Sequence, residues 1–455
     1  MLYSWSMDSR FLPHNLHIED LATFKGQDPH LSRLARMPYV YSSALIQKLP
    51  VRIPGVYTLS GGRQVGKSTL LKQWMLHLII NNNVLPQNIA FFSGEIIDDH
   101  HALLQLIQTQ LEQMPDGLRY IIIDEVTYIK SWDKAIKYAA DVGLLINVIL
   151  FLTGSDLVLI QEARNTFPGR RGQADVVDFH LYPLSFNEFL ELKGNRIALL
   201  EPLQHALLLA EFNNYLQHGG YLTAINDLAL HGKILNATFA TYSDWIRGDM
   251  QKRGKQEIYL REIINAIIKR YTSQLSCTWT SLAKELSIQH HKTVADYIDL
   301  LQLMDALYVQ PTLQEDKLLP APKKAKKVMF TDPFIYHALN AWLNPVEKIY
   351  EQQVQPLLQD AVLVSKLVET TVVTHYRRKY PTYYISAEGE VDLAYIENGK
   401  FWPIEIKWTQ QLRARDLKQI LKYKNAKIYS KLPGVSQMQG VTNEYLPYAL
   451  GCLSV

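Results

Sequence analysis

The sequence lacks the features of disulfide-stapled, zinc-ribbon and membrane proteins. Only two cysteines, Cys277 and Cys452, occur in 455 residues, and they lie far apart. This spacing excludes a disulfide framework and suits a reducing compartment. No apolar run approaches the ~20 residues that cross a bilayer, and the first residues, MLYSWSMDSRF, lack the long apolar region of a signal peptide. We therefore expect a cytoplasmic protein that does not enter a membrane.

A large charge of one sign is missing as well. The chain has 47 Lys and Arg against 44 Asp and Glu, a net charge of +3, so the whole-chain charge does not indicate a nucleic-acid partner. Its apolar content of 47% is typical of a soluble globular protein. Because 455 residues exceed one ordinary core, we expect about three domains.

The most informative segment follows the apolar run GVYTLS and reads GGRQVGKST. It is a complete G-x-x-x-x-G-K-[ST] phosphate-binding loop, in which glycines let successive N–H groups point at phosphate oxygens. The lysine reaches the β and γ phosphates, and the serine supplies a hydroxyl to Mg²⁺. The apolar pattern after it predicts a helix whose N-terminus favours anions. The predicted ATP-binding residues are Gly61, Gly62, Arg63, Gln64, Val65, Gly66, Lys67, Ser68 and Thr69.

Three β-rich runs, NIAFFSG, RYIIIDEV and NVILFLTGS, alternate with helical patterns and predict a parallel sheet. The second run ends in Asp124 and Glu125, at the strand end where ligands bind in such sheets. Asp124 would hold Mg²⁺ through water, and Glu125 would orient the attacking water. An acidic pair can also be an ordinary solvated turn. In FLTGS, Thr153 and Ser155 are candidate sensors of the γ-phosphate.

Two arginines follow in the Gly-flanked loop FPGRRG. Arg170 or Arg171 would act as an arginine finger, which supplies positive charge to the transition state in a neighbouring subunit. That role requires a homo-oligomer of at least two subunits. The alternative is a pair of surface arginines, and the sequence does not say where the loop points.

The segments GVYTLSGGRQVGKSTLL, YIIIDEV, FLTGS, GRR, YPLSFNEFL and YLQHGGYLTAI occur in this order. In that order they resemble the prokaryotic AAA-type ATPases that carry a C-terminal domain of formerly unknown function. The resemblance covers about residues 50–431. It implies a P-loop ATPase with an extra catalytic Glu and a capacity for assembly, followed by a winged-helix module and a nuclease-like fold. It does not supply a substrate.

Residues 249–309 have a helical pattern with the layout of a helix-turn-helix, and the run YVQPTL after it suggests a wing. The segment from His290 to Thr293 and the lysines of PKKAKK would meet DNA. Such modules also serve as packing or subunit contacts, and lysine runs are often solvated linkers. The neighbouring histidines His290 and His291 have no partner with metal-site spacing, so a zinc site is not expected.

The C-terminal part carries a second chemical pattern, in which Asn398-Gly399 predicts a hairpin between EVDLAYI and FWPIEIKW. Strand alternation puts Glu405 and Lys407 on one face, where Asp392 of the partner strand can join them. Asp392 and Glu405 would hold Mg²⁺ or Mn²⁺ for phosphodiester hydrolysis, and Lys407 would position water or stabilise charge. An E-x-K pair on a strand is also a common surface ion pair.

This arrangement is similar to the PD-(D/E)xK nuclease superfamily. The resemblance maps Asp392, Glu405 and Lys407 onto the motif, with Glu369 as the acid on the preceding helix. Gln419 and Tyr423 match the Q-x-x-x-Y helix motif of its RecB-like branch. The departure is Val391, which stands where the family usually has proline. From Lys366 to Lys431 the chain has 13 Lys and Arg against 7 Asp and Glu, which suits a phosphate backbone.

The predicted fold class is α/β: a P-loop NTPase parallel sheet of the AAA/ASCE type, a winged-helix module and a restriction-endonuclease-like domain. The expected segments are 1–195 with the ATPase, 196–248 as a helical lid or connector, 249–330 as the winged helix, and 331–455 as the nuclease-like domain. Residues 1–50 carry no interpretable motif.

The leading functional hypothesis is a DNA-acting, ATP- and Mg²⁺-dependent ATPase whose nuclease-like domain engages DNA; whether that domain also cleaves DNA is left open by the sequence. The alternative is a nucleotide-controlled switch that binds DNA or protein without cutting. A third hypothesis, a protein unfoldase, finds no substrate-processing segment in the sequence and leaves the nuclease pattern unexplained.

Overall fold

The computed structural model describes residues 7–154, 163, 165–195, 204–413 and 417–454. The chain divides into two compact units, Met1–Tyr182 and Pro183–Val455, called unit 1 and unit 2 below. Three of the four segments expected from the sequence fall largely in unit 2. Among the described helices, none has both the length and the apolar content needed to cross a bilayer.

A five-stranded sheet of order β2-β3-β4-β1-β5 forms the centre of unit 1. All its strand pairs are parallel, so the three strands predicted from the sequence are confirmed. The four longer strands are apolar nearly throughout because helices cover both faces of a parallel sheet. The strands are β1 (Gly55–Ser60), β2 (Ile89–Ser93), β3 (Arg119–Asp124), β4 (Val148–Thr153) and β5 (Asp178–His180).

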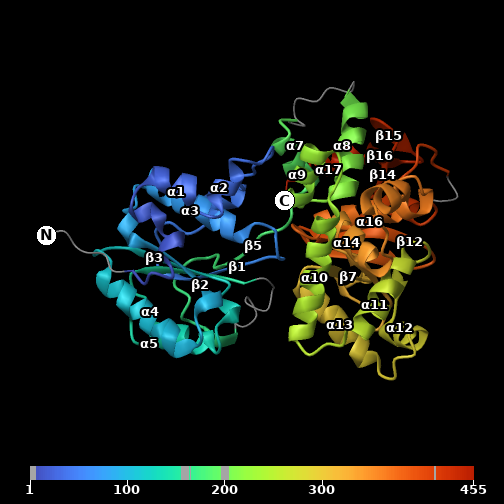
Figure 1. Ribbon diagram of the computed structural model, residues 1–455. Coiled ribbons are helices and arrows are strands. Elements are labelled where there is room, and N and C mark those ends of the chain that lie inside the picture. Colours follow the sequence, from blue (N-terminus) through green and yellow to red (C-terminus); the bar gives the residue numbers. More distant parts are fainter. Residues whose placement is uncertain (1–6, 155–162, 164, 196–203, 414–416, 455) are drawn as a thin grey trace. The chain divides into compact units, whose positions relative to one another are not determined.

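Helices α1, α2 and α3 lie on one side of this sheet, and α4 and α5 lie on the other (Figure 1). Alternate strand residues therefore enter two separate apolar clusters, one around Trp74 of α3 and the other around Ile107 of α4 and Trp132 of α5. The helices are α1 (Leu21–Gln27), α2 (Leu31–Leu34), α3 (Lys67–Asn82), α4 (His100–Gln113) and α5 (Trp132–Asp141).

The N-terminal segment closes the exposed edge of the sheet at β2. Asn15 is buried, and its amide nitrogen donates to Phe91 O at 2.8 Å while its oxygen accepts from Phe91 N at 2.8 Å. Nε2 of His17 lies 3.0 Å from Ile89 O on the same strand. An open strand edge is a template for unwanted pairing, and these side chains satisfy its backbone groups.

The first part of unit 2 is helical. Its helices are α7 (Phe186–Leu192), α8 (His205–His218), α9 (Leu222–His231), α10 (Asn236–Lys252) and α14 (Pro333–Leu343). The GG pair of YLQHGGYLTAI ends α8, and a Cβ on Gly219 would lie 1.6 Å from Oδ1 of Asp332, so only glycine fits. Gly220 N donates to Asp332 at 2.9 Å, which ties this turn to the start of α14.

The next part of unit 2 contains three helices and a three-stranded sheet. Their order along the chain is α11 (Glu257–Arg270), β6 (Ser276–Cys277), α12 (Trp279–Glu285), α13 (His291–Leu303), β7 (Leu307–Pro311) and β10 (Lys326–Phe330). The sheet order is β6-β10-β7, with antiparallel pairs. A short hairpin of β8 (Leu313–Gln314) and β9 (Leu319–Pro320) lies between β7 and β10.

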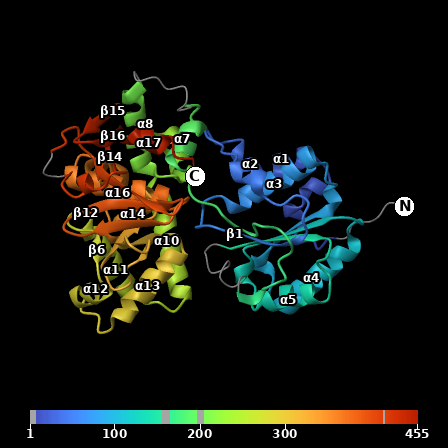
Figure 2. The same ribbon diagram turned by 180° about the vertical axis from the view of Figure 1, so that it is seen from behind.

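A six-stranded mixed sheet of order β11-β12-β13-β14-β16-β15 completes unit 2. Figure 2 shows α11, α12 and α13 at one end of unit 2 and β14, β15, β16 and α17 toward the other. The elements are α15 (Gln355–Leu357), α16 (Ala361–Tyr376), β11 (Thr382–Ser386), β12 (Glu390–Glu397), β13 (Lys400–Lys407), β14 (Lys427–Ser430), β15 (Val435–Met438), β16 (Val441–Tyr445) and α17 (Leu446–Gly451).

Two local expectations in this region have different outcomes. The turn between β12 and β13 is confirmed, because Asn398 and Gly399 have φ values of 52° and 70°, both positive as a type I′ turn requires. The helix expected around Gln419 and Tyr423 is wrong. Among the described residues, that region has only a 3-10 turn at Ile420–Lys422, which is too short to form the expected motif helix.

Candidate functional sites

The phosphate-binding loop lies between β1 and α3 and has the backbone that its glycines predict. Gly61 has φ 151°, and a Cβ there would lie 2.4 Å from Leu181 O, so no larger residue fits. Gly66 has φ 100° and precedes the first turn of α3. Gln64 also adopts a positive φ of 61°. The loop therefore curls between a buried strand and a helix N-terminus, where backbone N–H groups favour an anion.

Lys67 begins α3 and is only 5% exposed. Its ammonium donates to Gly61 O at 3.0 Å and Gly62 O at 3.1 Å, so the side chain folds back over the loop. It also lies 3.7 Å from a carboxylate oxygen of Glu125. These carbonyl contacts are replaceable by phosphate oxygens, which fits the role expected from the sequence.

Asp124 is the centre of a hydrogen-bonded network at the ends of two strands. Ser68 Oγ donates to its Oδ2 at 2.6 Å, and the hydroxyl of Thr153 donates to its Oδ1. The same Thr153 oxygen accepts from Glu125 N at 2.8 Å. Strand β4 lies between β1 and β3, which places Thr153 between the loop and the acidic pair. Three residues expected from separate motifs thus meet at one site.

Glu125 has a strained backbone and a carboxyl group that is largely buried. Its φ of 55° lies in the left-handed region, which is uncommon outside glycine and clusters at functional sites. Burial raises the pKa of Glu125, while the neighbouring Lys67 opposes that shift. Oε2 is buried and has no hydrogen-bond partner in the described part of the chain. Such an oxygen is suited to accept a hydrogen bond from an attacking water.

Ser68 and Asp124 are hard oxygen ligands of the kind that Mg²⁺ prefers, and they already lie within hydrogen-bonding distance. The residues present therefore fit a nucleotide-bound magnesium ion. Ser155, the other candidate sensor, lies outside the described residues.

The two candidate finger arginines have different surroundings. Arg171 lies 2.7 Å from Asp178 and donates to Val56 O and Val177 O, and it is only 11% exposed. Its guanidinium is used inside its own unit, which argues against a role in a neighbouring subunit. Arg170 is partly exposed and pairs with Asp141 at 2.5 Å on the surface.

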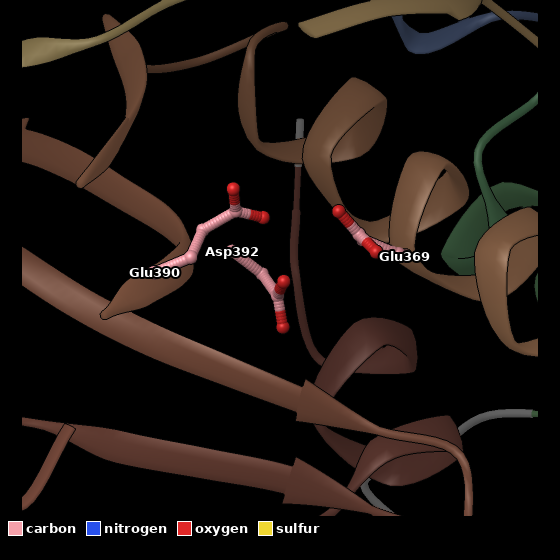
Figure 3. Close-up of side chains that lie close together, drawn as sticks. All are labelled: Glu369, Glu390 and Asp392. Atoms are coloured by element: carbon pink, nitrogen blue, oxygen red, sulfur yellow. The ribbon is translucent and has the colours of Figure 1, made fainter. Parts of the chain in front are cut away.

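A second site gathers three carboxylates of unit 2. Glu369 comes from α16, and Glu390 and Asp392 come from β12, two residues apart on the same strand face. One oxygen of each lies within 4.8 Å of the others. Figure 3 shows the three side chains pointing toward one another. The sequence identified Glu369 and Asp392 but missed Glu390, although its i, i+2 spacing to Asp392 was a usable signal.

A lysine that the sequence did not place here lies among these carboxylates. Lys327 Nζ is 2.6 Å from Glu369, 2.7 Å from Glu390 and 3.5 Å from Asp392, and its side chain is 1% exposed. Burial alone would lower the pKa of Lys327, but these carboxylates raise it well above its usual range. Lys327 belongs to the PKKAKK run expected to face DNA, and its burial rules out that contact.

Glu405 and Lys407 lie beside this cluster. Lys407 Nζ is 2.5 Å from Glu405 Oε1, and Asp392 accepts a hydrogen bond from Ile406 N at 2.9 Å. Burial and the charge of Asp392 raise the pKa of Glu405, whose Oε2 has no hydrogen-bond partner in the described part of the chain. The expected trio therefore meets. Gln419, another expected residue of this site, is buried, and its amide nitrogen donates to the hydroxyl of Tyr423 at 3.3 Å.

Comparisons with known proteins agree with the first site. Residues 54–190 match a family described as an AAA domain, and residues 209–345 match a domain of unknown function. An uncharacterised protein of Haemophilus influenzae is 26% identical over 259 residues, which cover 54% of this chain and 60% of that protein. The chain thus spans less than two thirds of that relative's length.

Similarity to two solved structures is low. A Walker-type ATPase of Pyrococcus abyssi has 12% identity and a TM-score of 0.42, covering 63% of this chain and 91% of that one. The Aeropyrum pernix ORC1 protein in complex with DNA has 11% identity and a TM-score of 0.33, covering 68% and 91%. Similarity this low does not bear on function.

The family match and the site geometry agree on one part of the chain. Residues 54–190 match an AAA domain, and the phosphate-binding loop, Asp124 and Glu125 lie within that match.

Proposed function

We propose that the protein is a Mg²⁺-dependent ATPase in which the nucleotide state of unit 1 controls DNA binding by unit 2. The observation that carries the ATPase part is the network joining Ser68, Asp124, Thr153 and Glu125 behind the phosphate-binding loop. No other described cluster combines a phosphate-binding backbone with acidic groups in this way.

In the proposed mechanism, Lys67 exchanges its loop carbonyl contacts for the β and γ phosphates of ATP. Ser68 and Asp124 would hold Mg²⁺, which would neutralise charge on the phosphates. Glu125 orients the attacking water through its unsatisfied oxygen. Thr153 fixes both acidic residues by contacting a side chain and a backbone N–H. Arg170 is the proposed finger in a homo-oligomer.

The DNA-binding part of the proposal rests on the module from α11 to β10. A helix, a short strand, two helices and a hairpin, with sheet order β6-β10-β7, are the layout expected of a winged helix. His290, His291 and Lys292 are exposed at the start of α13, and Lys317 and Lys323 are exposed in the wing between β7 and β10. These positions suit contacts to bases and phosphates.

The proposal assigns residues 361–445 to the nuclease-like fold. Supporting this, α16 is followed by three antiparallel strands, and β14 then joins β13 in parallel. The metal expected at Asp392 and Glu405 does not fit the arrangement, because each of these residues already lies beside an ammonium: Lys327 is 3.5 Å from Asp392, and Lys407 is 2.5 Å from Glu405. We therefore derive no cleavage step. The alternative function, a nucleotide-controlled switch that binds without cutting, is favoured by this one observation.

The first experiment measures steady-state ATP hydrolysis by the purified full chain, alone and with single-stranded, duplex, forked and four-way-junction DNA and with RNA. Stimulation by a DNA would support the proposal and identify the shape of the ligand. Stimulation by RNA alone would replace DNA by RNA as the partner. A rate indifferent to all of them, in protein that binds ATP, would refute control by nucleic acid and favour a protein partner.

Two lysine variants sharpen this experiment. Lys292→Ala, at the start of α13, should weaken DNA binding and lower the slope of log affinity against log salt by about 1, because one phosphate contact is lost. Lys269→Ala removes another exposed lysine, from α11, and is the matched control, which should bind DNA as the wild type does. Equal losses in both variants would contradict the proposed binding face.

A further inference from the structure

The carboxylates of Glu369, Glu390 and Asp392 have the separation of a metal site but not its surroundings. Divalent cations need several oxygen ligands at about 2.0–2.6 Å around a space that the ion alone occupies. Here that space faces Lys327 Nζ, which lies 2.6 Å and 2.7 Å from the two glutamates. An ammonium at hydrogen-bonding distance from the carboxylates and a metal ion among them would repel one another strongly in a buried setting.

The neighbours of Lys327 keep it in this position. Its strand, β10, pairs with β7 through five residues and with β6 through two, so its backbone is fixed from both sides. Tyr384 Oη donates to Ala325 O at 2.7 Å just before β10, and the Lys327 ammonium lies 5.2 Å from the Tyr384 ring centroid. On the carboxylate side, Lys366 also contacts Glu369 at 2.7 Å. Lys327 is thus a fixed, buried residue of the core rather than a mobile surface side chain.

We propose that Lys327 is a built-in counter-cation that takes the place of a metal ion at Glu369, Glu390 and Asp392. The carboxylate cluster is then a structural joint between β10 and the α16–β12 region, and it loads no divalent cation while Lys327 is present. The inference concerns the nuclease-like fold proposed above. The experiment that tests this inference measures metal binding. Failure of the proposed function would instead appear as an ATP hydrolysis rate that does not respond to nucleic acid.

The test counts Mn²⁺ ions bound by the full-length, nucleotide-free protein, using the electron paramagnetic resonance signal of free Mn²⁺. We expect wild type and Asp392→Asn to bind the same number of ions. Lys327→Met removes the ammonium while keeping most of the side-chain volume, and it should bind one more ion at least about tenfold more tightly than any ion in the wild type. Adding Asp392→Asn to Lys327→Met should abolish the extra site.

Lys326→Met is the matched control because it removes the neighbouring lysine, which points away toward Trp279, and it should bind Mn²⁺ as the wild type does. Circular dichroism and cooperative thermal unfolding show whether each variant is folded. A wild-type Mn²⁺ site that Asp392→Asn removes would overturn the proposal, and this comparison holds even if Lys327→Met fails to fold. A folded Lys327→Met protein without an added ion would overturn it as well.

Discussion

Thr153 offers a direct test of how unit 1 positions its catalytic acids. It is fully buried, and its hydroxyl donates to Asp124 while accepting from Glu125 N. Thr153→Val keeps the shape of the side chain but removes both hydrogen bonds. Asp124 and the N–H of Glu125 would then lose a partner that water cannot easily replace in a buried strand end.

The magnitude follows from these two contacts. A hydrogen bond to a charged group contributes about 1.5–3 kcal/mol and a neutral one about 1 kcal/mol, so Thr153→Val should destabilise unit 1 by about 3 kcal/mol. Residues that orient ligands in this way affect activity by about 10–100-fold, so we expect kcat for ATP hydrolysis to fall within that range. The KM for ATP should change little, because the phosphate-binding loop is not altered.

Thr58→Val separates loss of stability from loss of positioning. Thr58 is equally buried on the adjacent strand β1, donates to Asp178 at 2.6 Å and accepts from Arg171 at 3.3 Å. Urea unfolding should show similar destabilisation in the two variants, while phosphate release at saturating ATP should fall only in Thr153→Val. A normal kcat in Thr153→Val, or an equal fall in Thr58→Val, would refute the positioning role.

Three further predictions concern unit 1. Lys67→Ala should weaken ATP binding and abolish hydrolysis, whereas Glu125→Gln should bind ATP normally, measured with a fluorescent analogue, and lower kcat by about 10²–10⁴-fold. Asn15→Ala leaves the backbone N–H and C=O of Phe91 without their partner and should cost about 2–4 kcal/mol in urea unfolding; an unchanged midpoint would contradict the edge-closing role. Burial lowers the pKa of His17 to about 4, below its value in the unfolded chain. This shift contributes up to about 3 kcal/mol to the free energy of unfolding. The contribution is complete above pH 6.5 and is lost as the pH falls toward 4. His17→Gln should flatten the acid side of the stability profile, and a profile equal to that of the wild type would contradict this.

The ATP site was predictable because its chemistry is local in the sequence. The glycines, Lys67 and Ser68 of the loop lie within nine residues, and the acidic pair follows a β-rich apolar run that predicts a buried strand. Strand order then brings Thr153 to the same edge, which a parallel sheet makes predictable. For this site, short patterns and one rule of sheet topology were sufficient.

Other parts were not predictable because they depend on distant contacts. Lys327 belongs to the same lysine run as the exposed Lys323 and Lys324, and the contacts of its ammonium with α16 and β12 show that it is buried. Asn15 stands in a segment without periodicity, and its role depends on an edge strand 76 residues away. The expected helix at Gln419 matched a family pattern, but the described chain there forms only a short 3-10 turn.

The position of Lys327 also determines how the chain can be divided. The boundary expected at residue 330 would separate this lysine from its carboxylates, and Gln310, which donates to Asp392 O at 3.1 Å, would be lost as well. A fragment of residues 331–455 would keep Lys366 beside Glu369 but would lose the ammonium of Lys327 from Glu369, Glu390 and Asp392, at a cost of several kcal/mol. Expression of that fragment alone should give misfolded protein. In evolution, exchange of either module between related chains would have to transfer both together.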